Sequence, residues 1–384
     1  MDNTNFKINW IDGMKITKEH FQDLQNYTEN GIKNALVNRK SRFDYGISRP
    51  RLRAGSNFSI TLDTHKNLKI SIKRLLATTP DGNRIAISDR TPTVDDDIAI
   101  TDLVKNKSER GFLMLNLDAQ HPVAFGEPDP KEVPPRLPFL ADGYFFSYVD
   151  AEELGKMGVM GNQLPIAKIE NDGQNLSSTS DYIPPCTSVD ANDKLIAFYD
   201  RTDAFLKKAE QDVIAIARKI KARQNENPIA DAMFMPVDKS YSYLAQQITN
   251  VKWKQYEMHP RDLLEIVVTF ARLFKGSIDM SSPEDKEQLF NYFGDWTDLK
   301  GGDYEKTFNN IINLKYDHLD VNDNIKSVTN FMNTIGALLN VLTQVDYIGQ
   351  RRDMGIFVNE NKVMGNSGTS DTSNTAAGTS FLAE

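Results

Sequence analysis

Hydrophobic positions in the first half of the chain recur at every second residue, which is the spacing of a strand with one buried face. The alternating positions are Phe58, Ile60, Leu62, Leu68, Ile70, Ile72, Ile85 and Ile87. Residues 79–83, Thr-Pro-Asp-Gly-Asn, lie between the last two runs. Because proline presets φ and glycine accepts a positive φ, this segment predicts a hairpin turn.

Three more short apolar runs extend the strand-rich part, over residues 112–117, 144–149 and 166–169. Residues 122–138 hold six prolines and are predicted to form a long loop. Antiparallel strands with one buried face and turn-rich connections are typical of two-layer β structures. We therefore expect an N-terminal antiparallel β-sandwich over residues 1–190.

The hydrophobic period changes after residue 190. Apolar or small side chains, spaced alternately by four and three residues, occupy Leu195, Tyr199, Thr202, Leu206, Ala209, Val213, Ile216 and Ile220. This heptad spacing predicts a long helix, and Asn192 or Asp193 is a suitable N-cap. A second seam runs from Ile325 to Leu342.

Two proline-containing pairs mark further helix starts between these seams. His259-Pro260 and Ser282-Pro283 place a proline at a first helical position, where its missing N–H is not needed. The fold class is therefore α+β and multidomain, with an α-helical bundle or neck over residues 191–345. The pattern alone leaves open whether the heptad seams are buried within one chain or shared between subunits.

Composition and charge narrow the class of protein. The chain has 384 residues, a formal net charge of −8 and a single cysteine, Cys186. The acidic balance argues against nonspecific nucleic-acid binding, because phosphate neutralisation needs a basic surface. A lone cysteine fits a reducing compartment, and neither a secretory signal nor an apolar run of about 18 residues is found. We therefore expect a cytoplasmic protein.

Motifs for catalysis are absent from the sequence. The five histidines are scattered without the spacing of a zinc site, and no nucleotide cradle or nucleophile elbow occurs. Asp320, Asn322 and Asn324 match the start of a calcium loop, but Ile325 and Phe331 replace its glycine and glutamate. This segment is interpreted as a turn that caps the helix beginning near Ile325. We expect no enzyme activity, no cofactor and no metal.

The most informative motif lies near the N-terminus. It reads Trp10-Ile11-Asp12-Gly13-Met14, followed by His20-Phe21-Gln22 and Tyr27. It resembles the opening of the TssK family, the baseplate subunit of type VI secretion systems, which typically reads Trp-x-(Glu/Asp)-Gly-Met-x-Leu-x-Pro-x-His-Phe-Gln. Ile16 and Lys18 depart from that pattern. Further matches follow in chain order at Pro80-Asp81-Gly82, Ile183-Pro184-Pro185-Cys186, His259-Pro260 and Tyr316-Asp317-His318.

The resemblance implies a fold and a set of partners. TssK proteins have a β-sandwich shoulder similar to that of phage receptor-binding proteins, then a helical neck that forms a homotrimer. The shoulder attaches to the baseplate wedge proteins TssF and TssG, and a C-terminal head binds the membrane complex. The resemblance thus implies a noncatalytic adaptor at the cytoplasmic face of the inner membrane, and it favours a seam shared between subunits. A phage-like receptor-binding or tail-fibre adaptor is the alternative.

The N-terminal motif supplies the candidate partner-binding residues. They are Trp10, Gly13, Met14, His20, Phe21 and Gln22, while Leu195, Tyr199, Leu206, Val213, Ile216 and Ile220 are the candidates for the trimer or bundle seam. Large aromatic side chains suit either a binding hot spot or the locking of the first helix onto the sandwich. Gly13 is expected to supply a turn with positive φ.

Residues 346–384 are predicted to be a C-terminal remnant with a flexible tail. From about Asn359 the chain is rich in Ser, Thr, Gly and Asn and cannot bury enough apolar surface to order itself. A full head does not fit this length. We therefore expect a membrane-associated partner different from the usual one for this family.

Overall fold

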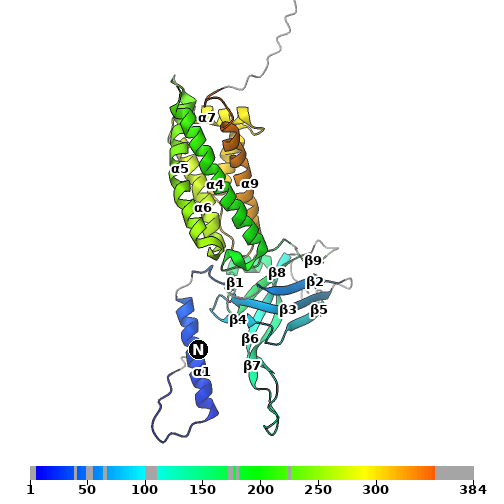
Figure 1. Ribbon diagram of the computed structural model, residues 1–384. Coiled ribbons are helices and arrows are strands. Elements are labelled where there is room, and N and C mark those ends of the chain that lie inside the picture. Colours follow the sequence, from blue (N-terminus) through cyan, green and yellow to red (C-terminus); the bar gives the residue numbers. More distant parts are fainter. Residues whose placement is uncertain are drawn as a thin grey trace, which may run out of the picture. The chain divides into compact units, whose positions relative to one another are not determined.

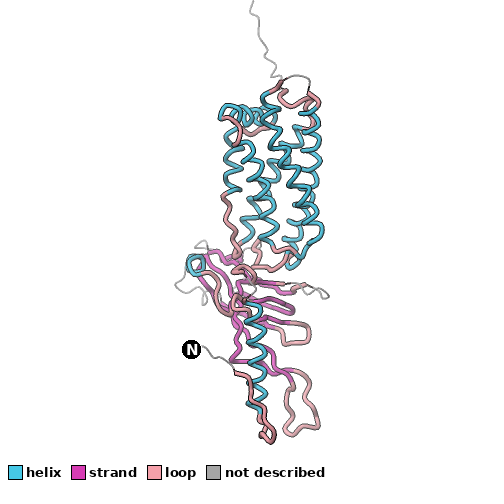
Figure 2. The backbone as a smooth tube through the Cα atoms, turned by 90° about the vertical axis from the view of Figure 1, so that its left-hand side faces the viewer, coloured by secondary structure: helices cyan, strands magenta, loops and turns pink. Residues whose placement is uncertain are grey.

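The computed structural model describes residues 6–38, 41–48, 55–63, 67–99, 110–171, 176–178, 181–223 and 226–350. Within these ranges the strands lie between residues 46 and 178, and the long helices after them occupy residues 193–342 (Figure 2). The change of hydrophobic period therefore marks the change from strand to helix, as predicted.

The first sheet is antiparallel and is organised around one long strand, β3 (Asn67–Thr78). Two strands pair with its first half and two with its second half. These are β2 (Asn57–Leu62), β5 (Val94–Ala99), β1 (Gly46–Ile47) and β4 (Arg84–Ile87). The predicted hairpin turn joins β3 to β4, with Thr78 opposite Arg84 and Gly82 at φ +80°.

The second sheet is also antiparallel, in the order β7-β6-β8-β9. Its strands are β6 (Arg110–Phe125), β7 (Phe139–Asp150), β8 (Gln163–Asn171) and β9 (Leu176–Ser178), and α3 (Ala151–Met157) follows β7. The loop predicted over residues 122–138 is shorter than expected, because β6 continues to Phe125. A register shift after Asp118 accommodates Pro122, since a bulge needs no ladder N–H from that residue.

The two sheets share one hydrophobic cluster. It contains Ile72 and Ile85 from the first sheet and Leu115 and Ile166 from the second. The opposite face of β6 is covered as well, because Phe112 and Met114 pack with Leu154 of α3 and with Tyr182. β6 is therefore buried on both faces over residues 111–117, which explains why its sequence is continuously apolar there.

The helical part begins after the short turn η1 (Val189–Ala191). Its helices are α4 (Asp193–Lys221), α5 (Pro228–Lys254), α6 (Pro260–Asp279), α7 (Pro283–Trp296), α8 (Gly301–Ile312) and α9 (Val321–Leu342), with the short η2 (Gln255–Glu257) after α5. Figure 1 shows α4 beside α5 and α9, in agreement with their contacts. The predicted helix starts are confirmed, since the side chains of Asn192, His259 and Ser282 accept from the first-turn backbone.

The heptad seam of α4 is buried inside the single chain. Leu206, Val213 and Ile216 have no exposed surface, and Leu195, Tyr199 and Ile220 are also buried. The Tyr199 hydroxyl donates to the Val251 carbonyl of α5 at 3.0 Å. Of the two alternatives that the sequence left open, the structure shows the one within the chain, because α5 and α9 of the same chain pack against α4.

Residues 343–350 close the end of the helical part. Ile348 is buried, and its carbonyl accepts from the Asn227 side chain at 3.0 Å. Trp296 Nε1 donates to the Gln350 carbonyl at 3.1 Å. The packed helical region thus continues to Gln350 and not only to residue 345. The predicted flexible tail lies outside the described residues.

Candidate functional site

The N-terminal motif lies on the surface. Trp10 is 47% exposed and Phe21 is 60% exposed. Gly13 has φ +79° in a turn where the Met14 N–H donates to the Ile11 carbonyl at 3.2 Å, so the predicted positive-φ turn is confirmed. His20 has a local role in the first turn of the next helix, because its Nδ1 accepts from the N–H of the N-cap residue Thr17 at 3.1 Å.

That helix is α1 (Lys18–Val37), and it has no buried residue. Phe21, Leu24, Ile32 and Leu36 are exposed and recur on one face. Gln22 is exposed too, while Met14 and His20 line a cavity of about 400 Å³. The alternative that Trp10 and Phe21 lock this helix onto the sheets is therefore not supported, because neither side chain is buried.

Three of the other motifs converge at one place, although they are far apart in the sequence. We call this place the junction; it comprises residues 43–48, 183–187, 258–261 and 315–320. The Ile47 N–H donates to the Pro185 carbonyl at 2.7 Å, and the Thr187 N–H donates to the Ile47 carbonyl at 2.9 Å. Gly46 is required here, because a Cβ would lie 2.2 Å from the Pro185 oxygen. The junction joins the first sheet to the helical part.

Two stacked histidines form the centre of the junction. His259 Nε2 lies 3.1 Å from the Phe43 carbonyl, and His318 Nε2 lies 2.8 Å from the Tyr45 carbonyl. Their rings are 5.4 Å apart and nearly parallel. A carbonyl only accepts, so each Nε2 carries the proton and donates, which assigns one tautomer to both rings.

Hydrogen bonds to the two Nδ1 atoms and the burial of the rings keep both histidines in this tautomer and uncharged. The Tyr316 hydroxyl lies 2.7 Å from Nδ1 of His318, and the Arg261 N–H donates to Nδ1 of His259 at 3.1 Å. Burial lowers the pKa of His318 from 6.5 to about 4, and burial also lowers the pKa of His259. Asp44 carries the carboxylate nearest to His259, with its Oδ1 4.0 Å from Nε2. The two histidines are therefore neutral hydrogen-bond donors at neutral pH.

Polar contacts from the start of α9 reinforce the junction. Lys168 of β8 forms a 2.8 Å ion pair with Asp320, and both side chains are mostly buried. Asn324 accepts from the Asp317 N–H at 2.8 Å and donates to the Lys315 carbonyl at 3.0 Å. The helix starts at Val321 and Asp320 does not cap it with its side chain, so the sequence interpretation of this turn is corrected.

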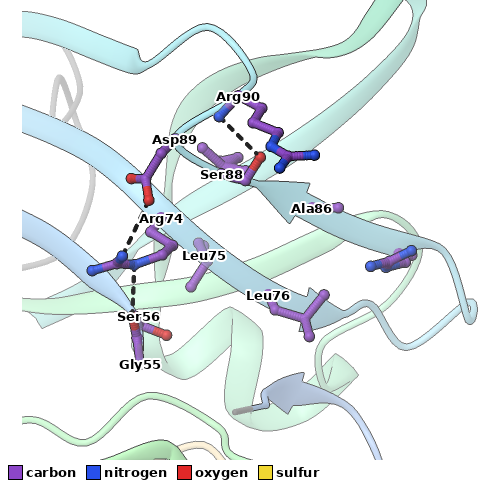
Figure 3. A pocket seen from close by; sticks show the side chains of 11 residues that line it. Gly55, Ser56, Arg74, Leu75, Leu76, Ala86, Ser88, Asp89 and Arg90 are labelled. Atoms are coloured by element: carbon purple, nitrogen blue, oxygen red, sulfur yellow. Dashed lines mark hydrogen bonds and ion pairs between the residues drawn. The ribbon is translucent and has the colours of Figure 1, made fainter. Parts of the chain in front are cut away.

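A pocket lined by arginines lies on the first sheet, around the β3–β4 hairpin (Figure 3). Its volume is about 610 Å³. Arg74 Nε donates to the Gly55 carbonyl at 3.1 Å, and Nη1 pairs with Asp89 at 3.2 Å. Arg84 and Arg90 also line the pocket. Sequence reasoning missed this site, although three arginines in one hairpin of an acidic chain are a usable signal.

Among the residues that the structure describes, neither a metal centre nor a membrane-spanning helix is found. Within the described ranges, no three His, Cys, Asp or Glu side chains gather closely enough to hold a metal ion. In the same part of the chain, no helix combines the length and the apolar character needed to cross a bilayer. Cys186 is buried, and burial raises its pKa.

The structure is similar to solved structures of TssK. A crystal structure of TssK matches with a TM-score of 0.51 and 15% identity, over 87% of this chain and 69% of that chain. A chain of the type VI secretion system TssK–TssF–TssG baseplate subcomplex matches with a TM-score of 0.49 and 14% identity, over 87% and 98%. TssK from EAEC bound to a nanobody matches at 0.47 and 15% identity, over 84% and 99%.

No family model and no curated protein matches the chain. Two antiparallel sheets followed by a helical bundle define an α+β scaffold. This scaffold has the TssK fold, so the resemblance inferred from the sequence motifs is confirmed at the level of fold.

Proposed function

We propose that the chain is a noncatalytic structural adaptor of a type VI secretion baseplate, acting as a trimeric subunit. It binds the wedge proteins TssF and TssG and links them to a membrane-anchoring complex at the cytoplasmic face of the inner membrane. The observation that carries this proposal is the TssK fold together with a TssK-like N-terminal motif held on the surface.

The N-terminal segment, residues 6–37, is the proposed wedge-binding surface. Trp10 and Phe21 are the largest exposed side chains of the motif, and tryptophan is enriched at the centres of protein interfaces. A helix without buried residues gains little stability from its own chain, since most helical stability in proteins comes from packing of an apolar face. Its apolar face is therefore available to a partner.

The trimer contacts must lie outside the seam of α4, since that seam is buried within the chain. Phe234 and Tyr241 are exposed on α5 and lie seven residues apart, so they face the same side of the helix. We assign them to the contact between copies. Light scattering is expected to give a mass three times the 43.4 kDa of the chain.

A pull-down of purified TssF–TssG with this protein tests the proposal. Alanine at both Trp10 and Phe21 is expected to weaken capture about thirtyfold, which corresponds to about 2 kcal/mol at a hot spot. The melting temperature stays unchanged because both side chains are exposed. Trp253→Ala is the matched control, since this tryptophan is 81% exposed on α5.

Three results contradict the proposal in different ways. No capture of the wedge by the unaltered protein removes the baseplate role, and binding to bacterial cell surfaces then favours the receptor-binding adaptor. Equal capture by the double variant leaves the baseplate role but removes the N-terminal segment as its surface. A monomeric mass in solution removes the trimer.

A further inference from the structure

The arginine pocket holds positive charge that the acidic side chains of the described residues do not fully pair with. Asp89 pairs with Arg74, and Asp89 is the single acidic residue among the described side chains that line the pocket. Arg84 and Arg90 line the same pocket and form no ion pair within the described residues. In the part of the chain that the structure describes, two guanidinium groups thus have no carboxylate partner, although the net charge of the chain is −8.

The geometry of the hairpin fixes where these arginines lie. Arg74 is held at its Nε by the Gly55 carbonyl and at Nη1 by Asp89, as Figure 3 shows. Arg84 stands opposite Thr78 at the first residue of β4. Arg90 lies in a turn that the Ser88 N–H closes by donating to Thr91 Oγ1 at 2.9 Å. The backbone on both sides of the pocket is therefore ordered by hydrogen bonds before any ligand binds.

The half-buried side chains of Leu76 and Ala86 line the pocket between the arginines, together with Ser56 and Ser88. Leu75 and Ile87 border it as well, but their side chains are buried in the core. A small inorganic anion uses the guanidinium groups but gains nothing from these aliphatic side chains. A peptide with carboxylate and apolar side chains uses both, because guanidinium forks pair with carboxylates in a bidentate manner and apolar contacts add affinity.

We propose that the arginine pocket is a docking site for an acidic segment of a partner protein, with Arg84 and Arg90 pairing with its carboxylates. The apolar side chains of this segment pack on Leu76 and Ala86. Arg74 is a positioning residue, because its guanidinium is already shared between Gly55 and Asp89. The site is separate from the N-terminal segment and does not depend on the proposed baseplate role.

Fluorescence anisotropy with a defined probe tests this site. The probe is a labelled peptide of about ten residues that alternates glutamate and leucine, an extended acidic and apolar ligand. Arg84→Gln and Arg90→Gln are each expected to weaken binding about tenfold, the loss for one charge-assisted hydrogen-bonded pair. Arg201→Gln is the matched control, because Arg201 is an exposed arginine on α4.

Two further ligands decide the chemistry of the site. A peptide with glutamine in place of glutamate is expected to bind at least tenfold more weakly, and raising salt from about 50 to about 200 mM weakens the acidic probe. The proposal is overturned if Arg84→Gln and Arg90→Gln both bind the probe like the unaltered protein, or if the glutamine peptide binds equally well. Tighter binding of a single-stranded oligothymidylate than of the peptide assigns the pocket to nucleic acid and also overturns it. An unchanged melting temperature in each variant shows that a loss of binding is not a loss of folding.

Discussion

Acid is expected to weaken the junction between the sheets and the helical part, through His318 and His259. Both side chains are buried and donate from Nε2 to backbone carbonyls of residues 43–45. Protonation adds a second N–H, at Nδ1, and puts positive charge beside a second imidazole at 5.4 Å. Burial disfavours that charge, and it therefore lowers the pKa of both rings.

The size of the effect follows from proton linkage. The pKa of His318 is about 4 in the folded protein and 6.5 for the unperturbed group, so the unfolded chain binds the proton first as pH falls. The stabilisation is complete above pH 6.5 and is lost progressively as pH falls toward 4. Between about pH 7.5 and pH 5, His318 alone accounts for about 2 kcal/mol of lost stability. His259 acts in the same direction.

The measurement compares urea unfolding at the two pH values in three proteins. His318→Gln removes the titrating ring but keeps an N–H donor near the position of Nε2, facing the Tyr45 carbonyl. This variant is expected to lose about 2 kcal/mol less than the unaltered protein on acidification, because its unfolding no longer includes the proton that His318 binds. His121→Gln is the control, since the side chain of His121 is 81% exposed.

The reasoning is refuted if His318→Gln loses as much stability on acidification as the unaltered protein, so that the stability difference between the two proteins is the same at both pH values. Such a result means that His318 matters for packing but does not bind a proton on unfolding. If His121→Gln reduces the pH dependence, surface charge and not the junction is responsible.

Two more predictions concern the ends of the helical part. Lys168→Met leaves the mostly buried carboxylate of Asp320 without its 2.8 Å partner and is expected to lower the free energy of unfolding in urea by about 2 kcal/mol. Adding Asp320→Asn restores part of this loss. A double variant that is less stable than the single one contradicts the pairing argument. Truncation after Gln350 is expected to leave the melting temperature unchanged. Truncation after Val345 also removes the buried Ile348 and is expected to lower the melting temperature by several degrees. Equal melting temperatures for the two truncated proteins contradict the packing of residues 346–350.

Local patterns in the sequence predicted the elements whose signals are local. The alternation through Leu68, Ile70 and Ile72 and the turn at residues 79–83 define β3, β4 and their hairpin, because strand period and turn chemistry depend on neighbouring residues. Asn192 and Ser282 predicted helix starts for the same reason. α5 was not predicted, since an internal proline at Pro236 obscures the helix signal that its neighbours support.

The candidate sites were less accessible to sequence reasoning. The motif residues Trp10 and Phe21 were identified, but their exposure is a property of the folded chain. The short His259-Pro260 and Tyr316-Asp317-His318 motifs are weak signals taken separately. The structure brings both against residues 43–45, which no local pattern indicates.

The sequence by itself determined that strands precede helices along the chain, where α4, α6 and α7 begin, and that the chain resembles TssK. It also determined that one face of α4 must be buried, because a heptad repeat of apolar residues places them on one side of a helix. Only the tertiary structure decided what buries that face, namely α5 and α9 of the same chain. The physical reason is that the hydrophobic effect is non-directional: periodicity specifies that a surface leaves water, and long-range packing selects the partner.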